Sequence, residues 1–155
     1  MNKKGISMVM FVVAIAIILA LTTAVTTSYT VIINSTKMRE FGNELNSIQK
    51  AVNEYNFLNN EYPIKEEYTL DLELIDEKSR ELQFGKTTGT MEFYIIDLNK
   101  LGITKLNRGL PGNLDNLDIY AISKESGKVY YLSGVSINKT VYYTLVDEIR
   151  EKLDI

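Results

Sequence analysis

The sequence predicts an α+β fold in which one long N-terminal helix packs on a small antiparallel β-sheet head. Two observations lead to this prediction. No proline occurs before Pro63 and no charged residue lies between Lys4 and Lys37, so we expect a long helix over residues 6–58 with an uncharged first half. Most of the nine glycines, both prolines and most of the ten tyrosines follow in residues 59–155, which favours strands and turns there.

The composition excludes several kinds of chemistry. The 155 residues include no histidine and no cysteine, so the chain lacks an imidazole base, a thiolate nucleophile, a Cys/His zinc site and any disulfide. The net charge of -3 has the wrong sign for a protein that neutralises nucleic-acid phosphates. No nucleotide-binding motif is present. We therefore expect neither an enzyme nor a nucleic-acid-binding protein.

The first half of the predicted helix, residues 6–36, is long enough to cross a membrane. A bilayer core of about 30 Å is spanned by about 20 apolar residues in a helix. Lys3 and Lys4 precede this segment, so the positive-inside rule places the N-terminus in the cytoplasm and the head outside. The sequence thus predicts a single-pass protein of the cytoplasmic membrane.

The second half of the helix, residues 37–58, is amphipathic. Its apolar residues recur at steps of three and four, which predicts one face that packs against the core of the head, while charged residues such as Arg39, Glu40 and Glu44 occupy other faces. Asn59, Asn60 and Pro63 should end the helix. The residues expected to pack against the head are Met38, Phe41, Leu45, Ile48, Val52 and Tyr55.

The head, residues 59–155, contains several strand patterns. Leucine alternates with acidic residues over 70–74, which predicts a half-buried strand, and the following segment 75–82 fits either more of the same element or a helical turn. Ser126 and Gly127 provide a turn between two β-rich runs, which predicts a hairpin over 118–137. The remaining expected elements are a strand over 91–96, a turn over 97–102, a strand over 140–146 and a terminal helix over 147–153.

Two groups of polar residues are candidates for binding. In the pairs Tyr130–Tyr131 and Tyr142–Tyr143, strand geometry should direct one tyrosine inward and the other outward, so half of them at most form an exposed row. Asn113, Asp115 and Asp118 form an oxygen-rich cluster. Calcium prefers such ligands, but the spacing lacks the EF-hand pattern, and an Asx-rich turn is the favoured interpretation. We expect no other cofactor.

The N-terminal sequence MNKKGISMVMFVVAIAIILAL resembles the class III signal of type IV prepilins and pseudopilins, in which a short basic leader ends in glycine directly before the apolar helix. The resemblance implies a leader of residues 1–5, with Lys3 and Lys4 as its charges, and cleavage by a prepilin peptidase between Gly5 and Ile6. Ile6 stands where the family usually has an N-methylated phenylalanine. The segment AVNEYNFLNNEYP and the predicted hairpin over 118–137 are also similar to the helix exit and head hairpin of pilin-like proteins.

Met10 stands where the family usually carries a glutamate, five residues into the mature chain. That glutamate is thought to neutralise the free amine of an adjoining subunit, and some minor members lack it. The resemblance therefore implies a structural subunit, minor or at the tip, of a type IV pilus or a pseudopilus of protein secretion. Its implied partners are other pilin-like subunits, an inner-membrane assembly platform and the lipid bilayer, and its implied final location is a cell-surface or periplasmic filament.

Within this interpretation the chain divides into four parts: the prepilin leader 1–5, the transmembrane and filament-core helix 6–36, the amphipathic helix 37–58 and the β-rich head 59–155. The main alternative is a signal-anchored single-pass protein whose head binds a ligand or a partner, and retention of residues 1–5 would favour it. A membrane-tethered enzyme that uses carboxylates, such as a glycosidase, is a further alternative, which requires two acids facing one cleft about 5–10 Å apart.

Overall fold

The computed structural model describes the backbone of residues 3–110 and 112–153, and their side chains except those of residues 3–11, 19–28 and 152. The chain divides into two compact units, Met1–Lys37 and Met38–Ile155, and each is described here by itself. Helix α1 (Lys3–Asn59) supplies the described part of the first unit and continues into the second. The boundary between the units lies one residue after the predicted division at 36/37.

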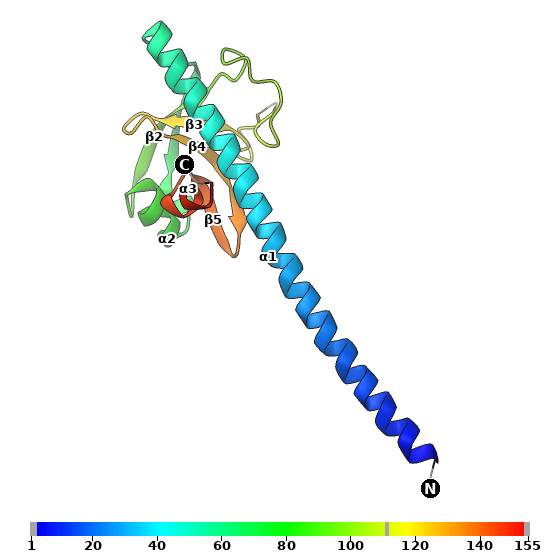
Figure 1. Ribbon diagram of the computed structural model, residues 1–155. Coiled ribbons are helices and arrows are strands. Elements are labelled where there is room, and N and C mark those ends of the chain that lie inside the picture. Colours follow the sequence, from blue (N-terminus) through cyan, green and yellow to red (C-terminus); the bar gives the residue numbers. More distant parts are fainter. Residues whose placement is uncertain (1–2, 111, 154–155) are drawn as a thin grey trace. The chain divides into compact units, whose positions relative to one another are not determined.

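The second unit contains a five-stranded antiparallel sheet with the strand order β1-β2-β3-β4-β5, so each strand pairs with the next one along the chain (Figure 1). This confirms the predicted α+β class with a long N-terminal helix and an antiparallel sheet. The strands are β1 (Ile64–Asp71), β2 (Thr90–Ile96), β3 (Tyr120–Ser123), β4 (Val129–Ile137) and β5 (Thr140–Thr144). The short helical segments are η1 (Leu72–Leu74), α2 (Glu77–Ser79), η2 (Arg80–Phe84) and α3 (Asp147–Leu153).

Helix α1 ends where the asparagines predict its end. Asn60 adopts the left-handed conformation, with φ of 55°, and its amide donates to the Asn56 carbonyl at 2.8 Å. The Asn59 side-chain amide donates to the Tyr55 carbonyl, so the last turn is closed by both asparagines. Pro63 follows and cannot continue the helix.

One face of the sheet packs against α1. The buried residues of this first core come from α1, from the strands and from α3, which contributes Ile149. Strand side chains Ile122, Val129 and Tyr131 meet the apolar stripe of α1. Because helical steps of three and four keep a stripe on one face, a single helix can cover this side of the sheet.

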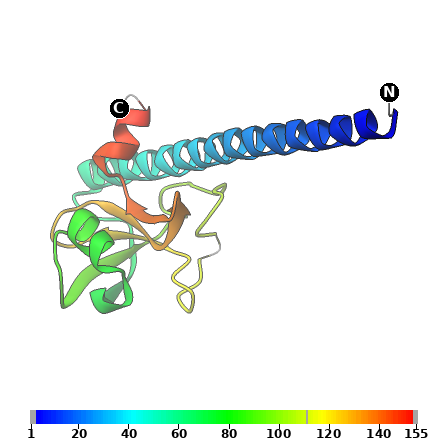
Figure 2. The same ribbon diagram turned by 90° about the horizontal axis from the view of Figure 1, so that it is seen from below.

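The opposite face of the sheet is covered by the segment after β1. Phe84 of η2 packs there against Tyr130 and Tyr143, and the green helical segment lies on the far side of the strands from α1 (Figure 2). The Asp76 carboxylate accepts a hydrogen bond from the Ser79 amide at the start of α2, and hydrogen bonds from Ser79 lower the pKa of Asp76. Gly85, with φ of 66°, ends this segment.

The second core corrects the prediction for the tyrosine pairs. Tyr130, Tyr131, Tyr142 and Tyr143 are all buried, and none is more than 9% exposed. Alternation along the strands holds, because Tyr131 and Tyr142 enter the first core while Tyr130 and Tyr143 enter the second. The prediction of an outward-facing tyrosine in each pair was wrong because both faces of the sheet are covered.

The expectation for residues 70–74 also needs correction. Strand β1 ends at Asp71, and Leu72–Leu74 form the 3-10 helix η1. Leu70 and Leu72 are buried, but Leu74 is 75% exposed. The Asp71 carboxylate accepts a hydrogen bond from the Glu73 amide, which turns the chain out of the sheet. The helical alternative for 75–82 is the one the structure adopts, as α2 and η2.

Candidate assembly surface and the polar anchor of the loop

The described part of the first unit exposes its apolar side chains. Val12, Ile15, Ile18, Tyr29 and Val31 belong to a set of large apolar residues of α1 whose exposed fractions range from 42% to 67%. Exposed apolar surface of this extent on a protein marks a place that contacts lipid or another protein. We call this set, within residues 12–18 and 29–32, the apolar collar. Its members are Val12, Val13, Ile15, Ile17, Ile18, Tyr29, Val31 and Ile32.

Most side chains of the predicted membrane span, and all those of the predicted leader, lie outside the described ones. Within the residues whose side chains are described, no helix is both long and apolar enough to cross a membrane. The candidate processing residues Gly5 and Ile6, the leader charges Lys3 and Lys4 and the assembly position Met10 lie outside the described side chains. Their backbone belongs to α1, which begins at Lys3.

The predicted packing stripe of α1 lies in the second unit. The structure buries Met38, Phe41, Leu45, Ile48 and Val52 in the first core, each at most 1% exposed. Tyr55 is different. It is half-buried outside this cluster, and its hydroxyl donates to the Glu61 carboxylate at 3.3 Å. The stripe therefore stops contacting the core one helical step earlier than predicted.

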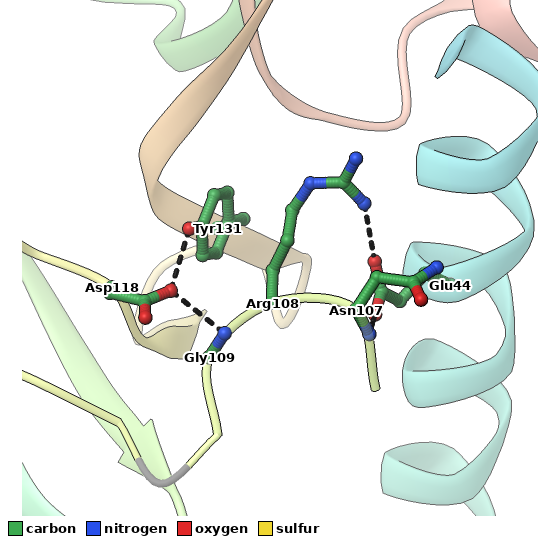
Figure 3. Close-up of polar contacts among 6 residues, drawn as sticks. All are labelled: Glu44, Asn107, Arg108, Gly109, Asp118 and Tyr131. Atoms are coloured by element: carbon green, nitrogen blue, oxygen red, sulfur yellow. Dashed lines mark hydrogen bonds and ion pairs between the residues drawn. The ribbon is translucent and has the colours of Figure 1, made fainter. Parts of the chain in front are cut away.

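Glu44 anchors to α1 the loop that connects β2 and β3 and contains Asn107, Arg108 and Gly109. It was expected on a polar face, but it is only 8% exposed, which corrects that expectation. Its Oε1 accepts a hydrogen bond from the backbone amide of Asn107 at 2.7 Å, and its Oε2 pairs with the Arg108 guanidinium at 2.8 Å (Figure 3). Glu44 lies three residues after Phe41 and four before Ile48, so its helical spacing places it beside the apolar stripe. That spacing was the signal in the sequence.

The Glu44–Arg108 pair is partly shielded from water. The exposed fractions of the two side chains are 6% and 19%, and the Arg108 guanidinium also lies over the Phe41 ring, 5.7 Å from its centroid. A shielded pair of this kind adds little net stability when intact, but removing one partner leaves a desolvated charge at considerable cost. The pair therefore fixes the position of the loop on α1 more than it strengthens the whole head.

Asp118 holds the same loop from the other side. Its Oδ1 accepts the Gly109 amide at 2.7 Å and the Tyr131 hydroxyl at 2.6 Å (Figure 3). Burial, and after it the hydrogen bond to Asp118, raises the pKa of Tyr131 to about 12. Carboxylates from α1 and from the end of the loop thus bind three consecutive residues, Asn107 to Gly109.

Two of the candidate calcium residues, Asn113 and Asp118, use side-chain oxygens within the chain. Asn113 Oδ1 accepts a hydrogen bond from the Asp115 backbone amide at 2.8 Å, which is the contact of an Asx turn. Asn113 and Asp118 also form an isolated antiparallel bridge. Among the described residues, no three histidine, cysteine, aspartate or glutamate side chains are grouped so that they could hold a metal ion.

Tyr120 lies beside the loop anchor in the first core. It is 2% exposed, and burial raises the pKa of its phenol, with the Glu44 carboxylate as the next cause. The edge of its ring faces Gly109, where an added Cβ would lie 2.7 Å from Tyr120 Cδ2. Gly109 also has a φ of 70°, so both the close contact and the backbone conformation require glycine at this position.

A groove runs between α1 and the loop. It has a volume of about 510 Å³, and its walls carry acidic and polar side chains from α1 and the basic Lys105 from the loop. Apolar side chains from both walls also line it. Its described lining residues are Glu40, Asn43, Glu44, Ser47, Ile48, Ile103, Lys105, Leu106 and Asn107.

Comparisons of the chain with protein-family models, with curated proteins and with solved structures gave no significant match. The class of protein therefore has to be argued from the apolar collar, the covered sheet and the sequence.

Proposed function

We propose that this chain is a structural subunit of a type IV pilus or pseudopilus-like filament, made as a membrane-inserted precursor and cut after Gly5 by a prepilin peptidase. The observation that supports this most is the apolar collar on α1, directly before the part of the same helix whose stripe is buried in the head. A helix with exposed apolar side chains around it needs an apolar environment, and a folded head joined to it needs water.

A filament gives that helix two suitable environments in turn. Before assembly, residues 6–36 lie in the bilayer, with the head outside the cytoplasm. After assembly, the same side chains contact the helices of neighbouring subunits. Lipid tails and neighbouring helices are similarly apolar, so the exchange is nearly neutral in free energy and the work comes from a separate assembly machine.

The proposed role is structural and not catalytic. The absence of histidine and cysteine from the sequence supports this, because those residues provide most nucleophiles and bases near neutral pH. The described carboxylates Glu44 and Asp118 also support a structural role, because each binds groups of its own chain and fixes the loop. The partners proposed are the peptidase, other pilin-like subunits and the membrane assembly platform.

The decisive test is N-terminal sequencing and intact-mass measurement of the protein taken from its native membrane. We expect a chain that begins at Ile6 and is one methyl group heavier than its sequence. A Gly5→Leu variant should keep its leader, and an Ile6→Leu variant should still be cut, which makes the two a matched pair. Native protein that begins at Met1 would contradict the proposal and favour the signal-anchored alternative.

The position within the filament is a second part of the proposal. Met10 in place of glutamate leaves the amine of an adjoining subunit without its usual partner, so we infer a minor or tip subunit. A Met10→Glu variant should enter the filament in larger amounts than the native chain, and a Met10→Gln variant should not. Counting subunits in purified filaments measures this, and equal amounts for all three chains would contradict the tip assignment.

A further inference from the structure

The two edges of the sheet belong to β1 and β5. An edge strand presents unpaired backbone N–H and C=O groups, which can pair with a strand from another chain. Proteins prevent this by covering the edge or by placing charges on it. The two edges of this sheet differ in which of these protections they have.

The outer edge of β5 is covered by side chains from α2 and η2, with Gln83 making two of the hydrogen bonds. Gln83 Nε2 donates to the Val141 carbonyl at 2.7 Å, and Gln83 Oε1 accepts the Tyr143 amide at 2.7 Å. Ser79 Oγ also donates to the Val141 carbonyl, at 3.3 Å. A neighbouring strand would offer β5 the same combination of one donor and one acceptor, so the Gln83 amide takes the place of a sixth strand.

Gln83 is held rigidly where it meets β5. It is 7% exposed, and its own carbonyl accepts the Tyr130 hydroxyl at 2.9 Å. The next residue, Phe84, stacks on the Tyr130 ring with centroids 5.0 Å apart and meets the Tyr143 ring edge-on at 5.3 Å. The second core thus fixes Phe84, which follows Gln83, and Tyr143, whose backbone amide Gln83 binds.

The outer edge of β1 has no comparable cover. The Lys124 backbone amide donates to the Glu92 carbonyl, so the backbone N–H and C=O of Glu92 point toward β3. Those of the next residue, Phe93, therefore point toward β1. Phe93 is paired with Tyr68, which leaves the backbone groups of Glu67 and Thr69 facing away from β2. In the described part of the chain, no hydrogen bond reaches the outer backbone groups of Glu67 and Thr69. The strand instead carries charges: Lys65, Glu66, Glu67 and Asp71.

Strand β5, with the sequence TVYYT, carries no charge at all. Its threonine, valine and tyrosine residues favour strands, and two copies could pair antiparallel without placing like charges opposite each other. We propose that Gln83 is an edge cap, which closes β5 against strand addition by a second copy of this chain. Charge performs the same task at β1.

The first test uses the native protein and needs no substitution. Residue-resolved hydrogen exchange in detergent should show the outer amide of Tyr143 as strongly protected as the inner amides of β3 and β4. The outer amides of Glu67 and Thr69 on β1 should exchange rapidly. Exchange at Tyr143 as fast as at Glu67 and Thr69 would overturn the proposal.

The second test compares two glutamines. At low concentration, where it is monomeric, a Gln83→Ala variant should exchange its Tyr143 amide at least about tenfold faster than the native chain, and at higher concentration it should form dimers. Gln49 is the matched control, because its amide also bonds backbone groups, at Gly127 and Val129, inside the β3–β4 hairpin. A Gln49→Ala variant should therefore lose hydrogen bonds of the same kind and still not associate.

The sizes of the native chain, Gln83→Ala and Gln49→Ala are compared by sedimentation in the same detergent. Any association through the apolar collar is then common to all three chains and does not affect the comparison. Adding Thr140→Lys to Gln83→Ala places a charge on β5 and should restore the native size. A folded Gln83→Ala variant of native size would overturn the proposal, as would dimers of Gln49→Ala in equal amount. If Gln83→Ala does not fold, the exchange of Tyr143 in the native chain decides the question.

Discussion

The two units of this protein use the same helix in opposite ways. In Met1–Lys37, the described large apolar side chains of the collar are exposed, whereas in Met38–Ile155 the apolar stripe of α1 lies under a sheet and a terminal helix. The first segment carries no charged residue between Lys4 and Lys37, whereas the second carries charges such as Arg39 and Glu40, but composition alone does not explain which side chains the head buries. The distribution around the helix does, because a stripe can be buried by one sheet but an apolar surface on all sides cannot.

The largest expected effect comes from removing an aromatic ring in the second unit. Phe41→Ala should destabilise the head by roughly 3–5 kcal/mol, because it leaves a cavity in the first core beneath Tyr131 and Arg108. Tyr29→Ala, in the apolar collar, should change the unfolding free energy of the head by less than about 0.5 kcal/mol. Denaturant unfolding of both variants in the same detergent measures the difference, and equal losses would break the comparison.

The next effect concerns the loop anchor. Glu44→Ala should cost about 3 kcal/mol, because it leaves Arg108 and the Asn107 amide without their partner. Glu40→Ala, one helical turn earlier and exposed, should cost less than about 0.5 kcal/mol. Faster hydrogen exchange at Asn107 and Gly109 should accompany the loss for Glu44→Ala. If their exchange is unchanged, the loop is held by Asp118 alone.

A smaller effect is expected where α3 meets α1. A Cβ at Gly42 would lie 2.5 Å from Leu153 Cδ1 and 2.6 Å from Ile149 Cγ2, so Gly42→Ala should displace α3 and cost about 1–2 kcal/mol net of the better helix propensity of alanine. Hydrogen exchange in α3 should rise in the variant. Adding Leu153→Ala should restore part of the protection, and a failure to do so would make Ile149 the residue that is displaced.

At neutral pH the smallest effect comes from removing one buried tyrosine hydroxyl, and it is coupled to a pH dependence. Burial raises the pKa of Tyr130, Tyr131 and Tyr142 to about 12, above the value near 10 expected in the unfolded chain. A raised pKa in the folded state means that stability is complete below pH 10 and is lost as the pH rises through about 12. Tyr131→Phe should cost about 1 kcal/mol at neutral pH through the lost bond to Asp118, but it should lessen the alkaline loss.

Alkaline titration of folding, followed by tyrosinate absorbance and circular dichroism, measures this dependence. The native chain should show a steeper decline in unfolding free energy above pH 10 than Tyr131→Phe. Identical declines would mean that the Tyr131 phenol ionises in the folded head as readily as in the unfolded chain.

Two of the sequence errors in this protein share one cause. The tyrosine pairs and Glu44 were assigned from local periodicity, and each assignment failed where a distant segment decided burial, whereas Leu74 leaves the sheet through the local hydrogen bond between Asp71 and Glu73. Residues 75–84 cover the second face of the sheet and bury Tyr130 and Tyr143, and the loop at Asn107 and Arg108 covers Glu44. Periodicity along a strand or helix reports which residues share a face, but not whether anything lies against that face.

The edge cap could not be found from the sequence either. Gln83 directly follows the segment 75–82, whose helical pattern was one of two open alternatives, and its two hydrogen bonds reach residues about sixty positions further along the chain. The calcium candidates show the reverse situation, because the Asx-turn interpretation rested on contacts between near neighbours, and the structure forms those contacts.

The sequence by itself determined the elements whose causes are local. It determined the long helix without proline, its end at two asparagines, the hairpin at Ser126–Gly127 and the division of apolar residues between collar and stripe. Only the tertiary structure decided that both faces of the sheet are covered, that Glu44 is a buried anchor and that β5 is capped by Gln83. Backbone propensity acts over a few residues, whereas burial depends on chain segments that only folding brings together.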